Sequence, residues 1–311
     1  MLSQEQVSYI HAVLFCAEEA KAYLGATIEG ELLSLLLEAP KINDYQDTDL
    51  ELFPLSVRRY LLSWHLVFDS FSSASNMVRR DYSDEIKTGG YLSPFLEFMF
   101  DILGHSAASP LKLDREHIDD SMIRKYDMWV ATNSESLERD MHWLLVNLYY
   151  LCLKYIPGEV KSWWLDCKNR QTSIAVRAWT EKYFSTLIVQ DLLDDVSQWS
   201  EKQEAESDDE KKLQVKVSKN SREVSAGYEI DEMEMKMVIR LPPAYPLSIA
   251  TVESVNRVAI PVEKWQTLLR STQGRIQFAV SLSLLYEYRF TTDHFSRTVL
   301  SWTAWKLSER M

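Results

Sequence analysis

This sequence of 311 residues has few cysteines, no long apolar run and no excess of positive charge. The three cysteines, Cys16, Cys152 and Cys167, form no close pair, which excludes a disulfide framework or a cysteine-rich zinc site and favours a reducing compartment. No apolar run approaches the roughly 20 residues of a membrane helix, and residues 2–15 lack a basic leader and a cleavage site, so we expect a soluble chain without a signal peptide. The formal net charge of -12 argues against nucleic-acid or membrane binding through net charge, but not against a local basic patch.

The sequence motifs of common catalytic sites are also missing. There is no G-x-G-x-x-G, Walker A or G-x-S-x-G sequence. His65 and His142 lie within apolar helical patterns, which is typical of core histidines, and the other four histidines have no companions at metal-ligand spacing. The three aspartates within residues 191–195 lie near the end of a predicted helix, where a solvated face is the ordinary interpretation and a general acid the alternative.

The first two thirds of the chain show helical periodicity without strands. Apolar residues at steps of three and four predict helices over Val7 to Tyr23, Gly30 to Leu37, Leu55 to Val78, Ser93 to Leu103, Ser134 to Tyr155 and Ile174 to Gln190. We interpret Arg79 to Gly90 as a polar break and His105 to Asp120 as a loop. Successive helices of moderate length indicate an α-solenoid or its C-terminal cap, with an irregular bundle as the alternative because no repeat period is visible.

A charged stretch separates this helical part from a strand-like part. Ser200 to Lys212 has no aromatic or β-branched residue and cannot bury apolar surface, so we expect a linker or a solvated loop there. After it, Met233, Met235, Met237 and Ile239 alternate with Glu234, Lys236, Val238 and Arg240, which is the period of a strand with one buried face. Three such runs between Val215 and Trp265 predict an antiparallel meander, and the prolines of L-P-P-A-Y-P-L end its middle part. The fold class is therefore α+β, with an all-α N-terminal region.

Several motifs in this order resemble one known family. They are K-Y-I-P-G-E-V-K-S-W-W at 154–164, W-T-E-K-Y at 179–183, S-R-E-V-S-A-G-Y-E-I-D-E at 221–232, L-P-P-A-Y-P-L at 241–247 and V-E-S-V-N-R-V-A-I-P-V-E-K-W at 252–265. Together they resemble the C-terminal region of the listerin family of RING-type E3 ubiquitin ligases. Residues 1–147 fit the HEAT-like helices of that family by character and position.

The resemblance implies a division into a HEAT-like helical region at 1–199, a charged linker at 200–212 and an RWD-like domain, similar to ubiquitin-conjugating domains, at 213–311. In the family, the helices form a curved arm, and the RWD domain docks on the large ribosomal subunit near the exit of the nascent-chain tunnel. RWD domains lack the catalytic cysteine of conjugating enzymes, and here no cysteine follows Cys167, which excludes thioester chemistry in this domain.

The resemblance also implies a RING that binds two zinc ions through eight cysteine and histidine ligands. After Trp265 this sequence offers only His294, so the zinc ligands are absent here, and we expect no cofactor in this chain and no ligase activity from it alone. Ala304-Trp305-Lys306 matches the segment that precedes the RING in the family.

Residues 280–296 do not match the family pattern. They read V-S-L-S-L-L-Y-E-Y-R-F-T-T-D-H-F-S, and Thr292 to Ser296 is compatible with a translated branch point and splice acceptor. We therefore weigh a translated retained intron against a lineage-specific loop.

Two functional hypotheses follow. In the first, the chain is the ribosome-docking and positioning region of a ligase that ubiquitinates stalled nascent chains, found in the cytosol on ribosomes. Its expected partners are the large ribosomal subunit, other quality-control subunits and, through the RING alone, a ubiquitin-conjugating enzyme; no membrane is expected. Candidate ribosome-binding residues are Lys216, Lys219, Arg222, Arg240 and Arg257, with ordinary solvated strand residues as the alternative. In the second hypothesis, the chain is an RWD interaction module unrelated to ubiquitin transfer.

Overall fold

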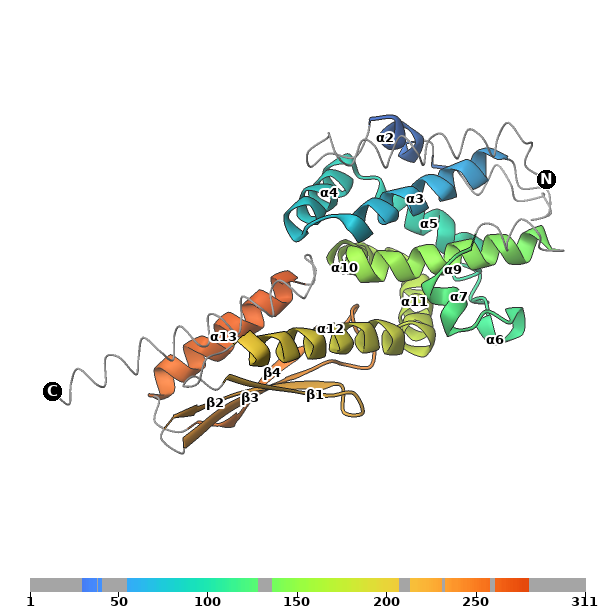
Figure 1. The fold of residues 1–311 in the computed structure, drawn as a ribbon. Coiled ribbons are helices and arrows are strands. Elements are labelled where there is room, and N and C mark those ends of the chain that lie inside the picture. Colours follow the sequence, from blue (N-terminus) through green and yellow to red (C-terminus); the bar gives the residue numbers. More distant parts are fainter. Residues whose placement is uncertain are drawn as a thin grey trace. The chain divides into compact units, whose positions relative to one another are not determined.

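The computed structural model describes residues 30–37, 39–40, 55–127, 136–206, 213–230, 233–257 and 261–279 (Figure 1). The chain divides into two compact units, Met1–Val176 and Arg177–Met311, which we call the helical unit and the sheet unit. The predicted helix at Val7 to Tyr23 and the unusual segment 280–296 lie outside the described residues.

The helical unit is built around one long buried helix. Its described helices are α2 (Gly30–Leu36), α3 (Leu55–Ser73), α4 (Asn76–Gly89), α5 (Leu92–Ile102), α6 (Leu113–Glu116), α7 (Asp120–Arg124), α9 (Leu137–Tyr155), α10 (Pro157–Asp166) and the first part of α11 (Arg170–Tyr183). All residues from 140 to 150 in α9 are buried, because neighbouring helices cover it on several sides. Aromatic stacking fixes the core, as between Trp64 of α3 and Phe95 of α5, whose ring centroids are 4.5 Å apart.

The predicted helix from Leu55 to Val78 is confirmed as far as Ser73, but its predicted end and the polar break after it were wrong. Helix α3 ends at Ser73, and residues 76–89 form α4. The Ser75 Oγ accepts from the Val78 N–H and so caps the first turn, while Gly90 ends the helix with φ of 67°. The short helix α6 lies within the predicted loop, and α7 begins at the last residue of that loop, Asp120.

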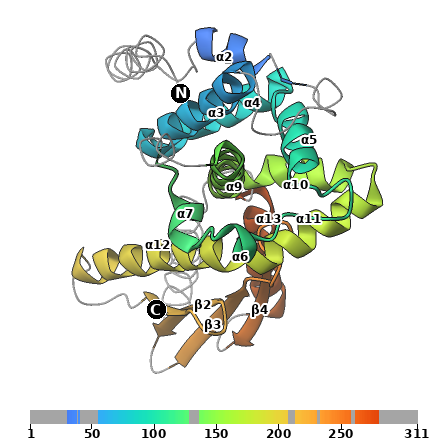
Figure 2. The same cartoon turned by 90° about the vertical axis from the view of Figure 1, so that its right-hand side faces the viewer.

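The sheet unit contains α12 (Ser185–Glu206), β1 (Leu213–Ser218), β2 (Glu223–Ile230), β3 (Met233–Arg240), β4 (Thr251–Asn256) and α13 (Val262–Ala279). The strands are antiparallel in the order β1-β2-β3-β4, which confirms the meander, although the first predicted run holds two strands. Both views show α12 and α13 on the same face of the sheet (Figures 1 and 2). The predicted α+β class is confirmed.

Helix α12 belongs to the sheet unit. Residues 200–206 are the end of this helix rather than a loop, and the Ser200 Oγ donates to the Val215 carbonyl of β1 at 3.3 Å. The predicted helix over Ile174 to Gln190 is also interrupted, because α11 ends at Tyr183 and α12 begins at Ser185. Residues 207–212 lie outside the described part, so the linker there stays a prediction, as do the domain boundaries.

The loop from 241 to 250 leaves the sheet, as its prolines predict. Most of its apolar residues are buried, among them Tyr245, which precedes Pro246 through a cis peptide bond. Where the chain re-enters the sheet, the Gln273 side chain of α13 donates to the Ala250 carbonyl and accepts from the Val252 N–H, both at 2.9 Å. One amide therefore satisfies two main-chain groups at the outer side of β4.

Candidate docking face of the sheet unit

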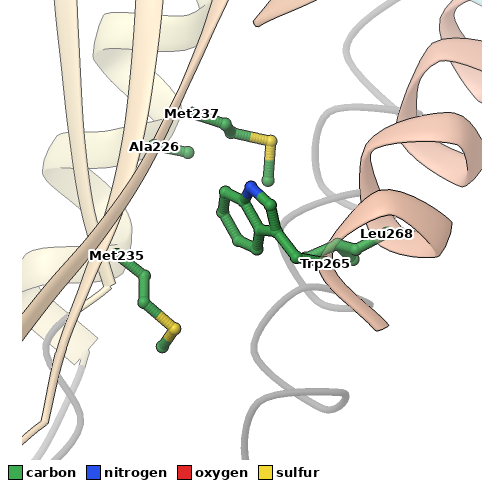
Figure 3. Packing of buried hydrophobic residues seen from close by; sticks show 5 residues of the cluster. All are labelled: Ala226, Met235, Met237, Trp265 and Leu268. Atoms are coloured by element: carbon green, nitrogen blue, oxygen red, sulfur yellow. The ribbon is translucent and has the colours of Figure 1, made fainter. Parts of the chain in front are cut away.

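One face of the sheet is closed by α13. Its apolar cluster comprises Ala226, Met235, Met237, Trp265 and Leu268 (Figure 3). Trp265 is 1% exposed, and its Nε1 donates to the Ser254 Oγ of β4 at 2.8 Å. The indole is both packed and hydrogen-bonded, so this face is core. The predicted alternation along β3 is confirmed at Met235, Met237 and Ile239, which are all buried, but not at Val238, which lies on the opposite face and is buried too.

The opposite face of the sheet carries the alternate residues of each strand. Register places Lys216, Ser225, Val238 and Glu253 in one row across the four strands, and Ser218, Glu223, Arg240 and Thr251 in the next. Among the described elements of this unit, neither helix covers these rows in Figures 1 and 2. We call this surface the polar face.

Arg240 is held by two carboxylates on the polar face. Its Nε lies 2.8 Å from the Glu223 Oε1 on β2, and its Nη1 lies 3.3 Å from the Glu253 Oε2 on β4. The three side chains are partly exposed, so each pair contributes only about 0.2–1 kcal/mol. Their main effect is to join three strands and to balance the charge of the guanidinium group.

Lys219 and Arg222 lie in the turn between β1 and β2, where both make contacts within the unit. The Lys219 Nζ forms an ion pair with Asp194 of α12. Arg222 has φ of 53° and donates through Nη2 to the Thr186 Oγ1 at 2.9 Å and through Nη1 to the Pro243 carbonyl at 3.4 Å. These contacts tie the turn to α12 and to the loop after β3.

The structure does not gather the five predicted basic residues into one patch. Lys219, Arg222 and Arg240 lie at the end of the sheet that holds the β1–β2 turn, whereas Lys216 lies within β1 and Arg257 follows β4. The polar face adds Lys236 of β3, which sequence reasoning missed as a binding candidate. Lys236 could have been predicted to lie on the solvent-facing side of the strand, because it stands between Met235 and Met237 in the alternating run.

Two buried polar side chains of α9, Asp140 and His142, lie beside charged side chains of other helices. Asp140 accepts from the Tyr126 hydroxyl at 2.9 Å and forms an ion pair with Arg58. Burial raises the pKa of Asp140, and the Arg58 charge opposes that shift. The His142 Nδ1 lies 3.8 Å from a Glu116 carboxylate oxygen, yet burial lowers the pKa of His142. His142 is buried and His65 half-buried, as expected for histidines in an apolar helical pattern.

The sheet unit has no nucleophilic thiol, because the last cysteine in the sequence is Cys167. Cys152 is fully buried in α9, which raises the pKa of its thiol well above the ordinary value. Within the described ranges no three potential metal-ligating side chains come together. The helices seen in those ranges are also too short or too polar to cross a membrane.

Fold and chemistry together define a class: a helical region followed by a domain of the ubiquitin-conjugating type that has no thiol to accept ubiquitin. Comparison with family models agrees on both parts. Residues 1–197 match the LTN1 family HEAT repeat region, and residues 213–277 match the ubiquitin conjugating domain-like family. The chain belongs to the LTN1 family.

Curated relatives carry the name E3 ubiquitin-protein ligase listerin. The protein of Neurospora crassa is 47% identical over 255 residues, which cover 82% of this chain and 16% of the relative. The proteins of Schizosaccharomyces pombe and Xenopus tropicalis are 29% and 27% identical, with 78% and 67% of this chain covered and 14% and 12% of the relatives. The chain thus spans at most about a sixth of the length of these three relatives.

Proposed function

We propose that this chain is the docking and positioning region of an E3 ubiquitin ligase that acts on stalled nascent chains at the large ribosomal subunit. The observation that carries the proposal is the combination of LTN1-family membership with a conjugating-type domain that has no cysteine. Such a domain offers a surface but no cysteine to accept ubiquitin as a thioester, so its contribution is to bind and to orient.

The proposed mechanism is positional. A docked sheet unit holds a catalytic module tethered to it at a high effective concentration near the emerging chain, and no covalent step takes place in residues 1–311. A ubiquitin-conjugating enzyme and other quality-control subunits are the further partners we propose, with the cytosol as the compartment.

The polar face is the surface we propose for docking, with Lys216 and Lys236 as its basic contacts. Ion pairs with Glu223 and Glu253 balance Arg240, whereas Lys216 is exposed and Lys236 half-buried on the same face. Ribosomal RNA is a polyanion, so lysine contacts to phosphate make binding weaker as salt rises.

The test is co-sedimentation of the full 311-residue chain with large ribosomal subunits that carry peptidyl-tRNA. We expect the double variant K216E/K236E to weaken binding by about tenfold and to flatten its salt dependence. The control, K202E/R270E, makes the same charge change at exposed positions of α12 and α13 and should bind as the parent does. Absence of sedimentation of the parent chain at moderate salt would favour an interaction module unrelated to ubiquitin transfer.

A further inference from the structure

The helical unit contains a half-open groove of about 610 Å³ whose residues play no part in the proposed docking. One wall comes from the end of α4 and from α5, and the other from α10 and the segment that joins it to α11. This volume lies in the range of about 300–1,000 Å³ that is typical of ligand sites in proteins. We call it the acidic groove, because carboxylates outnumber lysines among the residues that line it.

Acidic residues outnumber basic ones along this groove. Four carboxylates line it against two lysines, a formal charge of -2; the carboxylates are Glu97, Asp101, Glu159 and Asp166. Glu159 is paired with Lys87, whose Nζ lies 3.2 Å from its Oε1. Besides Lys87, Lys168 is the one lysine among the lining residues, so the other three carboxylates leave the groove with a net negative charge that attracts cations.

Two of these carboxylates are oriented by short local contacts. The Ser93 Oγ donates to the Glu97 Oε1 at 3.2 Å, and the Ser106 Oγ donates to the Asp101 Oδ1. A neutral hydroxyl leaves the negative charge in place, and each carboxylate keeps a second oxygen that can accept from an incoming donor. The acceptors are therefore positioned but not neutralised.

An aromatic side chain adds a second recognition element. Trp163 lines the groove and is half-buried, and its ring stacks on Phe100 with centroids 5.2 Å apart and planes 15° from parallel. A tryptophan held in place beside carboxylates suits a guanidinium group, which stacks on aromatic rings and donates in a fork to carboxylates.

We propose that the acidic groove binds an arginine-containing basic segment of a protein partner. The charge of the groove selects against a nucleic acid, because phosphates are repelled by the same carboxylates. This proposal does not depend on the proposed function, since it concerns the helical unit alone.

The test is fluorescence anisotropy of the full chain with a labelled peptide of alternating arginine and glycine. The chain has a formal charge of -12 and attracts any polycation, so the comparison of variants decides the outcome. We expect E97Q/D166N to weaken binding about fivefold to tenfold, since charge-assisted hydrogen bonds are lost. The matched control, D81N/E181Q, removes two exposed carboxylates outside the groove and should weaken binding less than twofold.

A third variant gives an effect of opposite sign. Replacement of the exposed rim lysine, K168Q, removes a competing cation and should tighten binding about twofold to threefold. Circular dichroism of each variant checks that the helices are intact. Equal weakening by E97Q/D166N and by the control would overturn the proposal, as would tighter binding of a single-stranded RNA oligonucleotide than of the peptide.

Discussion

His105 is buried in the turn that follows α5, with its ring 4.7 Å from that of Phe100 in an edge-to-face arrangement. Burial lowers the pKa of this imidazole to about 4, and hydrogen bonding to the backbone of Leu103 and Phe100 offsets part of the shift. The folded chain therefore holds His105 in its neutral form over most of the range in which a free histidine becomes charged.

This shift predicts a loss of stability in acid. The unfolded chain binds a proton at His105 near pH 6.5 and the folded chain only near pH 4, so stability falls as the pH drops between these values. At pH 4.5 we expect a cost of about 2–3 kcal/mol relative to pH 7. Urea unfolding at both pH values should show that His105→Leu lowers this acid loss by that amount. If the variant and the parent lose stability in parallel, the assignment to His105 is wrong.

For single residues, the sequence pattern predicts whether a side chain is buried or basic, but not which other side chain it contacts. His65 and His142 could be predicted as core residues because they sit in apolar periodic helices, whereas His105 follows a glycine in a predicted loop that gave no sign of burial. Likewise Arg240 was visible as a basic strand residue, but its neutralisation by Glu223 and Glu253 depends on cross-strand register.

Helices and strands whose apolar residues form a continuous stripe could be predicted from the sequence. Helices with only a few apolar residues on one side could not. Helix α9 and strand β3 show clear periods, and the structure has both. Helix α4 was missed because only a few side chains, such as Val78, Tyr82 and Ile86, form its inner side, and the remainder is polar. Its two ends are instead set by Ser75 and Gly90, which act through the backbone.

Replacement by alanine should therefore change the free energy of unfolding in opposite directions at two glycines, Gly90 and Gly274. Gly90 has φ of 67°, and no atom lies within 4 Å of an added Cβ, so Gly90→Ala should cost about 1–2 kcal/mol through backbone strain alone. Gly274 is inside α13 with equally free space, and Gly274→Ala should stabilise by about 0.5–1 kcal/mol through helix propensity. Chemical denaturation measures both. If Gly90→Ala left the stability unchanged or raised it, the α4 end would not require the left-handed conformation.

For the whole chain, the sequence predicted two parts and placed residues up to 199, which include most of α12, in the helical part. The family match for the helical region extends to residue 197, yet α12 lies in the compact unit with the sheet. Tertiary contacts attach α12 to the sheet: Thr186 accepts a hydrogen bond from Arg222, and Asp194 forms an ion pair with Lys219. Ser200 donates a hydrogen bond to the Val215 carbonyl. Such contacts between distant positions leave no local pattern in a sequence.

A fragment that begins at Arg177 should consequently fold better than one that begins at Leu213. The shorter fragment lacks α12, in which Leu193 and Val196 are buried and from which Ser200 and Asp194 contact β1 and the turn after it. We expect residues 177–311 to unfold cooperatively, and residues 213–311 to melt at a much lower temperature or without a sharp transition. Thermal melts followed by circular dichroism compare the two. Equal melting temperatures would mean that α12 is dispensable for the sheet.

The Gln273 amide at β4 also bears on how the sheet unit meets other chains. An edge strand offers a row of main-chain groups to which a foreign strand can add, and that process leads to aggregation. At β4, the Ala250 carbonyl and the Val252 N–H are already hydrogen-bonded to the Gln273 side-chain amide, which takes the place of a neighbouring strand. At the other edge, the hydroxyl of Ser200 occupies the Val215 carbonyl in a similar way. Addition of a foreign strand at these edge positions is therefore disfavoured, because the main-chain groups that it would pair with are already hydrogen-bonded.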